Sequence, residues 1–132
     1  IPHAAWVAQK LDLPMIYVRD KVKGHGKQNQ IEGRLNEGEK VIVIEDLIST
    51  GGSSLKAAQA VNAAGGRTLA VLAIFSYQFE KAESAFREAG IPLQTLSNYT
   101  ALVETALRLD RIRPEDVAAL QAWRTKPETF YA

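Results

Sequence analysis

The chain has 132 residues, of which 46% are hydrophobic, a formal net charge of +1 and no cysteine. This size and apolar content suit a single domain with one core, and the small net charge excludes a general attraction to nucleic acid or to a membrane surface. Without cysteine there are no disulfides and no thiolate metal sites, which fits a reducing compartment. The apolar stretches are far shorter than the ~20 residues that cross a bilayer, so we expect a cytoplasmic protein.

Hydrophobic periodicity predicts helices and strands that alternate along the chain, without internal repeats. In chain order the sequence predicts a helix at 4–10, a strand at 15–18, a strand at 40–44 after a long polar loop, a helix at 55–64, a strand at 68–75, a helix at 80–89, a strand at 92–96 and helices at 99–109 and 114–125. The alternation predicts one α/β domain over 1–132, with a mainly parallel sheet flanked by helices on both sides. Residues 41–44 are β-branched throughout, which is typical of a central strand buried on both faces. Trp6 and Trp123 are expected in the core.

Two acids and a turn of small residues follow the strand at 40–44. The acids are Glu45 and Asp46, and the turn contains Ser49, Thr50, Gly51, Gly52 and Ser53. At a turn from strand to helix, free backbone N–H groups and the helix dipole favour an anion, and glycine lets the backbone approach it. The segment lacks both the lysine of a triphosphate loop and a G-x-G-x-x-G pattern. Carboxylates only accept hydrogen bonds, so the acids match the hydroxyl donors of a ribose beside a phosphate. Such a turn is also common in α/β proteins, and the acids could simply be solvated.

The polar segment at 19–35 is long and basic. It carries Arg19, Lys21, Lys23, His25 and Lys27 within nine residues, interleaved with glycine. Loops longer than about 12 residues without secondary structure are usually functional lids or disordered segments. A cationic lid would stabilise negative charge on a leaving group and keep water from the reacting centre. A solvated basic loop is the simpler alternative.

Together the two segments resemble type I phosphoribosyltransferases. Residues 45–53 resemble the ribose-phosphate motif of that family. Their sequence, Glu-Asp-Leu-Ile-Ser-Thr-Gly-Gly-Ser, is similar to the form that this motif takes in the orotate phosphoribosyltransferases. Residues 17–26 resemble the catalytic loop of the same family, and the likeness continues through 74–77 and 99–106 to the end of the chain. The resemblance implies a glycosyltransferase that transfers the 5-phosphoribosyl group from 5-phosphoribosyl 1-diphosphate (PRPP) to orotate. The products would be orotidine 5-monophosphate and diphosphate, in de novo pyrimidine biosynthesis.

The resemblance also implies roles for individual residues. Residues 49–53 would bind the 5-phosphate, Glu45 and Asp46 the ribose hydroxyls, and Arg19, Lys23 and His25 match the catalytic cations best. In the family these cations reach the active site of the neighbouring subunit, which implies a homodimer with shared sites. Mg²⁺ is the implied cofactor, held between pyrophosphate and ribose oxygens without a dedicated protein metal site. Asp20 stands where many relatives have lysine and Gln78 where some have an orotate-binding arginine, and neither is assigned a role.

Members of the family carry a hood over the base, active-site lysines and a pyrophosphate loop ahead of the first helix, and the sequence at 1–132 contains none of these. We therefore expect a fragment that holds the ribose-phosphate half of a site. Two alternatives stay open, namely a phosphoribosyltransferase for another base, such as a purine, and a non-enzymatic regulator that senses the ribosyl diphosphate and binds nucleic acid. The motif wording favours orotate, and the net charge of +1 disfavours the regulator.

Overall fold

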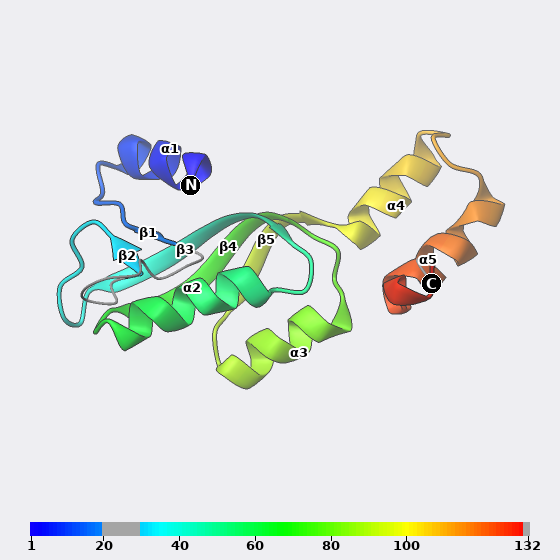
Figure 1. Cartoon of the computed structure of the whole chain (residues 1–132). Helices are drawn as coiled ribbons and strands as arrows, with labels where there is room; N and C mark the ends of the chain where they lie inside the picture. The colour runs from blue at the N-terminus through cyan, green and yellow to red at the C-terminus, as the bar shows by residue number, and fades with distance from the viewer. Residues whose placement is uncertain (20–29, 131–132) are drawn as a thin grey trace.

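The computed structural model describes residues 1–19 and 30–130 and confirms an α/β architecture (Figure 1). Its helices and strands, in chain order, are α1 (Pro2–Leu11), β1 (Tyr17–Val18), β2 (Ile31–Glu32), β3 (Lys40–Ile48), α2 (Gly52–Ala63), β4 (Arg67–Ser76), α3 (Glu80–Ala89), β5 (Leu93–Asn98), α4 (Tyr99–Arg108), η1 (Pro114–Asp116), α5 (Val117–Thr125) and η2 (Pro127–Phe130). The predicted final helix is divided, because its first turn from Pro114 to Asp116 is a 3₁₀ turn.

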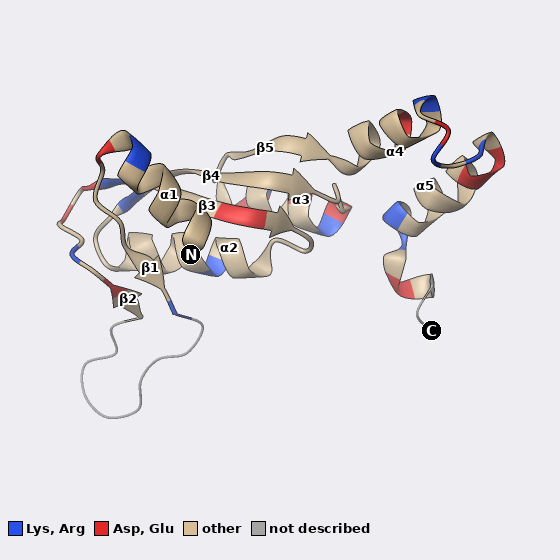
Figure 2. Ribbon diagram, turned by 90° about the horizontal axis from the view of Figure 1, so that it is seen from above, with Lys and Arg blue, Asp and Glu red and all other residues tan. Residues whose placement is uncertain are grey.

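Three parallel strands form the main sheet, in the order β3-β4-β5. Helices α2 and α3 cover one face, and α1 lies against β3 on the opposite side (Figures 1 and 2). The core lies between the sheet and the α2–α3 layer, and its buried members are Ile48, Leu55, Ala58, Val71, Ala73, Ala82, Phe86 and Ile91. This arrangement brings the carboxyl ends of all three strands to one edge of the sheet, where α2, α3 and α4 begin.

The position of β3 differs from the prediction. The β-branched run at 41–44 does form a strand, but β4 is the central strand, and β3 pairs only with β4 among the residues described. Ile42 and Leu47 are each 41% exposed. A β-branched composition favours a strand, but the order of strands depends on pairing between distant segments, which composition does not record.

The short strands β1 and β2 form a separate antiparallel ladder that pairs Tyr17 with Glu32 and Val18 with Ile31. The predicted strand at 15–18 is therefore only two residues long. Its partner β2 was not predicted, because two residues within a polar segment leave no detectable periodicity. The ladder closes the two ends of the segment between Val18 and Ile31.

Helices α4 and α5 extend away from the sheet at the other end of the molecule (Figure 1). An aromatic cluster of Tyr77, Phe79, Tyr99 and Trp123 joins them to the end of β4, with ring centroids 5.3 to 6.4 Å apart. The Tyr99 hydroxyl also donates a hydrogen bond to the Leu120 carbonyl (3.1 Å). Trp123 packs in this cluster but is only partly buried and lies outside the core, so the prediction of a core position was wrong for it. The prediction for Trp6 was also wrong, because its side chain is 64% exposed on α1.

Candidate functional site

The candidate site lies at the carboxyl edge of the sheet, where β3 leads into α2. Strand β3 runs to Ile48, so Glu45 and Asp46 lie within the last four residues of the strand and not after its end. Their acidic stretch is visible on β3 in Figure 2. The Tyr77 backbone N–H donates to the Ile48 carbonyl (3.1 Å), which keeps the end of β4 beside the turn at 49–51.

Gly51 determines how this turn enters the helix. Its φ of 78° lies in the left-handed region, and a Cβ at this position would be 2.9 Å from Cε2 of Phe86. Only glycine satisfies both conditions without strain. The Gly51 carbonyl accepts hydrogen bonds from Leu55 N (3.0 Å) and from the Ser54 hydroxyl (3.2 Å), which fixes the first turn of α2.

The start of α2 presents free donors. The first hydrogen bond along the helix begins at Leu55 N, so the N–H groups of Gly52, Ser53 and Ser54 precede the helical ladder. In the described part of the chain no side chain caps this end, and no acid occupies its first turn. The side chains of Ser49, Thr50 and Ser53 are exposed around it. This end of α2 is therefore suited to an anion with several oxygen atoms.

The two other helices that start at this edge are unsuited to an anion. At α4, Asn98 Oδ1 accepts from Ala101 N (2.9 Å) and Gln78 Oε1 accepts from Thr100 N (3.0 Å), so side chains already satisfy the first turn. At α3, the first turn carries Glu80 and Glu83, which would repel an anion. Of the three helix starts, that of α2 offers the anion site.

Glu45 and Asp46 differ in environment although they are neighbours. The Asp46 backbone N–H donates to Glu45 Oε1 (3.0 Å), and the Leu47 N–H donates to Asp46 Oδ1 (2.7 Å). Burial raises the pKa of the half-buried Glu45 carboxyl, whereas hydrogen bonds, first with Glu45 and then with Leu47, lower the pKa of exposed Asp46. Glu45 and Ser53 line the same cavity beside β3, and Asp46 is not among the lining residues.

Arg19 directly follows β1, next to the β1–β2 ladder. Its guanidinium forms an ion pair with Glu32 (3.0 Å), its backbone N–H donates to the Gln30 carbonyl (2.9 Å), and its carbonyl accepts from Gln30 Nε2 (2.8 Å). Arg19 does not line the cavity that contains Glu45 and Ser53. Lys23 and His25, the other predicted catalytic residues, lie outside the described residues, as does Asp20.

Gln78 has a structural role that the sequence did not reveal. It has a φ of 58°, and its backbone N–H donates to the buried Ser76 hydroxyl (2.9 Å). Its side-chain oxygen accepts from both the backbone N–H and the hydroxyl of Thr100 (2.7 Å for the hydroxyl). Gln78 thereby ties the start of α4 to the end of β4. A left-handed conformation at a residue other than glycine leaves no clear signal in a single sequence.

No group of three or more His, Asp or Glu side chains in 1–19 and 30–130 could hold a metal ion. Among the same residues no helix has the length and apolar character needed to span a membrane.

Comparison with known proteins identifies relatives of this chain. No protein-family model matches it. Orotate phosphoribosyltransferase of Listeria innocua serovar 6a is 54% identical over 130 residues, which make up 98% of this chain and 62% of that protein. The crystal structure of orotate phosphoribosyltransferase from Aeropyrum pernix is 30% identical with a TM-score of 0.70, and the match covers 79% of this chain and 58% of that one. The Mycobacterium tuberculosis H37Rv enzyme in complex with PRPP is 30% identical with a TM-score of 0.50, and the match covers 56% of this chain and 45% of that one.

The sequence identity extends over almost the whole of this chain, and the solved structures share its parallel sheet and helices. The chain spans about three fifths of the length of the relatives that it matches. Over the residues that it spans, the chain is similar to the orotate phosphoribosyltransferases in both sequence and fold.

Proposed function

We propose that this chain supplies the PRPP-binding part of an enzyme that transfers the 5-phosphoribosyl group to orotate, in the biosynthesis of UMP. The relatives' name supports the reaction, and 54% identity over 98% of the chain supports its transfer to this protein. The main structural support is the first turn of α2, which no side chain caps and which lies beside a carboxylate. It combines free N–H donors for an anion with a group that accepts hydrogen bonds from hydroxyls.

In the proposed complex the backbone N–H groups at the start of α2 hold the 5-phosphate, and the hydroxyls of Ser49, Thr50 and Ser53 add donors. Glu45 and Asp46 accept from the ribose hydroxyls. The bond between ribose C1 and the diphosphate oxygen breaks and its electron pair leaves with diphosphate. N1 of orotate forms the new bond to C1, and its proton passes to the leaving diphosphate or to water. Positive charge develops on the ribose ring as the bond breaks, and the two carboxylates stabilise it.

Mg²⁺ fits the chemistry of this site as a cofactor held largely by the substrate. It prefers oxygen ligands in octahedral geometry and retains water, so diphosphate and ribose oxygens can supply most of its ligands. Glu45 and Asp46 would offer carboxylate oxygens near the proposed ribose site. When bound, the ion would neutralise charge on the leaving diphosphate.

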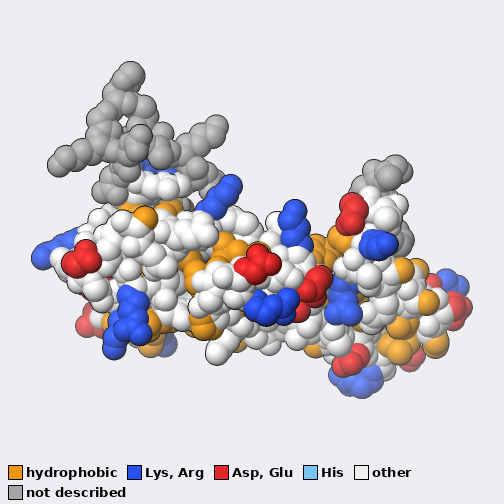
Figure 3. Space-filling model, turned by 90° about the horizontal axis from the view of Figure 1, so that it is seen from below, with side chains coloured by type: hydrophobic (Ala, Val, Ile, Leu, Met, Phe, Trp, Pro, Cys, Tyr) orange, Lys and Arg blue, Asp and Glu red, His pale blue; other side chains and the backbone are white. Residues whose placement is uncertain are grey.

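We further propose that Arg19, Lys23 and His25 act on the diphosphate, and that the protein works as a homodimer in the cytoplasm, as the resemblance implies. The two alternatives have less support. The relatives' name favours orotate over another base. Among the described residues on the face shown in Figure 3, basic side chains lie among acidic ones, an arrangement that does not favour nucleic acid.

The test measures orotate consumption from its ultraviolet absorbance, with PRPP and Mg²⁺. It compares the 132-residue chain with a version extended in its own reading frame to a natural start codon, here called the extended protein. Turnover that requires PRPP is expected in the extended protein, and PRPP binding is expected in both. Absence of turnover in the extended protein, with adenine or another base consumed instead, would overturn the orotate assignment.

A further inference from the structure

Tyr77, which follows β4, connects the strand that leads into the turn at 49–51 with helices α4 and α5. Its backbone N–H donates to the carbonyl of Ile48 (3.1 Å), the last residue of β3. Its ring centroid lies 5.5 Å from that of Trp123 on α5 and 6.4 Å from that of Tyr99 on α4. A single residue therefore contacts both the beginning of the turn and the helices at the far end of the molecule.

The turn at 49–51 is held at both ends by hydrogen bonds to backbone carbonyls. At its end, two donors from the first turn of α2 bond to the Gly51 carbonyl. At its start, the Tyr77 N–H holds the carbonyl of Ile48, whose side chain is buried in the core. A shift of Tyr77 would move the first of these two anchors, and with it the hydroxyl-bearing residues at 49 and 50.

Trp123 packs against three rings that come from separate elements. Its ring centroid lies 5.3 Å from that of Phe79, just before α3, and 5.3 Å from that of Tyr99, the first residue of α4. The rings of Tyr77 and Phe79 are also stacked on each other, with centroids 5.3 Å apart and 18° between their planes. Because packed rings restrict one another's orientation, Trp123 limits the positions that Tyr77 can take.

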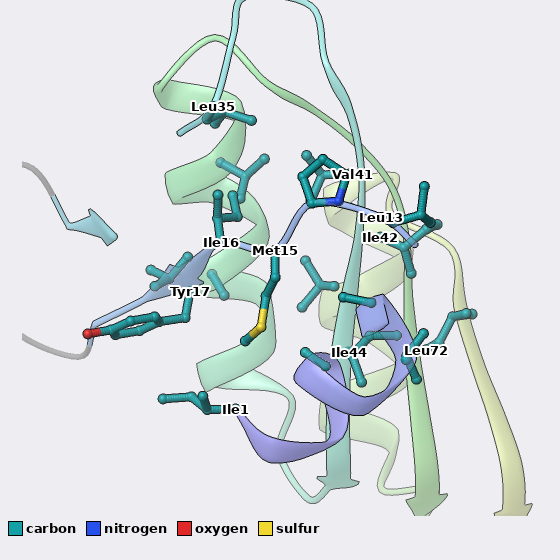
Figure 4. A pocket seen from close by; sticks show the side chains of 18 of the residues that line it. Ile1, Leu13, Met15, Ile16, Tyr17, Leu35, Val41, Ile42, Ile44 and Leu72 are labelled. Carbon is teal, nitrogen blue, oxygen red and sulfur yellow. The ribbon is translucent and has the colours of Figure 1, made fainter. Parts of the chain in front are cut away.

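Trp123 does not border the cavity beside the candidate site. Figure 4 shows this cavity along β3, and its lining includes Glu45 and Ser53 but neither Tyr77 nor Trp123. A ligand beside Glu45 and Ser53 in this cavity therefore meets neither ring. Any effect of Trp123 on that ligand has to pass through Tyr77 and its bond to the end of β3.

We propose that Trp123 is a positioning residue for the phosphate site. It fixes the ring of Tyr77, and the Tyr77 N–H in turn fixes the Ile48 carbonyl and the path of the turn at 49–51. The assignment of this turn to the 5-phosphate rests on the function proposed above, whereas the control of the turn by Trp123 does not. Coupling of this kind is reciprocal, so a ligand at the turn also stabilises the packing around Trp123.

Amide hydrogen exchange in the 132-residue chain tests the proposal without a ligand. Trp123→Leu removes the ring, and the Tyr77 N–H should then exchange about tenfold faster than in the wild type. The amide of Val71, a fully buried residue in the middle of β4, is the control for general destabilisation. A Tyr77 amide that accelerates no more than the Val71 amide would overturn the proposal.

Steady-state kinetics of the extended protein provide the second test. Trp123→Leu should raise the KM for PRPP about tenfold and leave kcat nearly unchanged, because the turn binds the phosphate equally in the substrate and in the transition state. Trp123→Phe retains a ring and should restore most of the lost affinity. Tyr99→Phe is the matched control, since it removes the hydrogen bond to Leu120 and keeps every ring of the cluster, so its KM should equal that of the wild type.

An unchanged KM in Trp123→Leu would overturn the proposal. An equal rise in Tyr99→Phe would also overturn it, because the effect would then follow the stability of α4 and α5 rather than the ring. The proposed function fails in a different way. An extended protein that consumes no orotate, with a Tyr77 amide that responds selectively to Trp123→Leu, would support the control of the turn by Trp123 and refute the orotate reaction.

Discussion

Replacing Gly51 with alanine is expected to destabilise the fold by about 2–5 kcal/mol. Holding alanine in the left-handed region at φ 78° costs roughly 1–2 kcal/mol. The new Cβ would also lie 2.9 Å from Cε2 of Phe86, which is only 3% exposed and has little room to move. Overpacking of this kind costs about 1–3 kcal/mol. The combined effect is a large part of the ~5–15 kcal/mol that typically separates folded from unfolded protein.

Gly52 provides the matched control, because a Cβ there would meet no atom within 4 Å. It is the first residue of α2, and Gly52→Ala should change the free energy of unfolding by less than about 1 kcal/mol. If the backbone at Gly52 approaches the 5-phosphate, however, the added methyl group should weaken PRPP binding. Stability and ligand affinity are thus expected to respond to different glycines of the same turn.

Urea denaturation followed by circular dichroism measures the free energy of unfolding of both variants, and calorimetry measures their affinity for PRPP. Equal stability of Gly51→Ala and Gly52→Ala would refute the role given to φ and to Phe86. Unchanged PRPP affinity in Gly52→Ala would refute the idea that the backbone at Gly52 lies close to the 5-phosphate.

Three further predictions concern the acids and the α4 cap. Asp46→Asn should weaken PRPP binding about tenfold or more, because a charged acceptor is lost. The control is Asp110→Asn, on the exposed loop after α4. Equal affinities of the two variants for PRPP, measured by calorimetry, would exclude Asp46 from the site. Because the pKa of Glu45 is raised, PRPP affinity should begin to fall on acidification at a higher pH than an ordinary glutamate would cause. The phosphates titrate in the same direction, so only the difference between wild type and Glu45→Gln isolates this effect, and identical pH profiles would contradict it. Gln78→Ala should destabilise the fold by about 1–2 kcal/mol, because the hydrogen bond from Thr100 N–H to the Gln78 side chain is lost. Gln78→Gly should destabilise it by less, because glycine adopts φ 58° freely. A melting temperature of Gln78→Ala equal to that of the wild type would refute the capping role of Gln78.

Local signals in the sequence predicted the helices and strands well where residues typical of a start and a stop lie at both ends of the element. Helix α3 occupies 80–89 as predicted, because its periodicity is clear and Gly90, at φ 64°, ends it. The end of β3 was harder to predict. The apolar run stops at Ile44, yet the strand continues to Ile48, so the two acids fall within the strand rather than after it. Charged residues interrupt the apolar pattern from which a strand is recognised.

The candidate site was predictable in its residue types but not in its partners. The spacing of acids, hydroxyls and glycines identified the turn before α2. In contrast, the ion pair between Arg19 and Glu32 joins residues 13 positions apart, and the bonds from Gln78 to Thr100 join residues 22 positions apart. Such pairs depend on which segments become neighbours in the fold, and the sequence around one partner does not indicate which residue the other partner is.

The three helix starts at the carboxyl edge show how the sequence could direct an anion to one of them. All three helices have the same dipole at their N-termini, so backbone geometry alone would make them competing sites. Asn98 and Gln78 occupy the donors of α4, and Glu80 and Glu83 place negative charge at the start of α3. At α2 the corresponding positions hold glycine and serine, which neither accept the helical N–H groups as caps nor repel an anion. Selectivity for the start of α2 thus depends on residues of the other two helices, and removing the Gln78 cap would open a second, weaker anion site at α4.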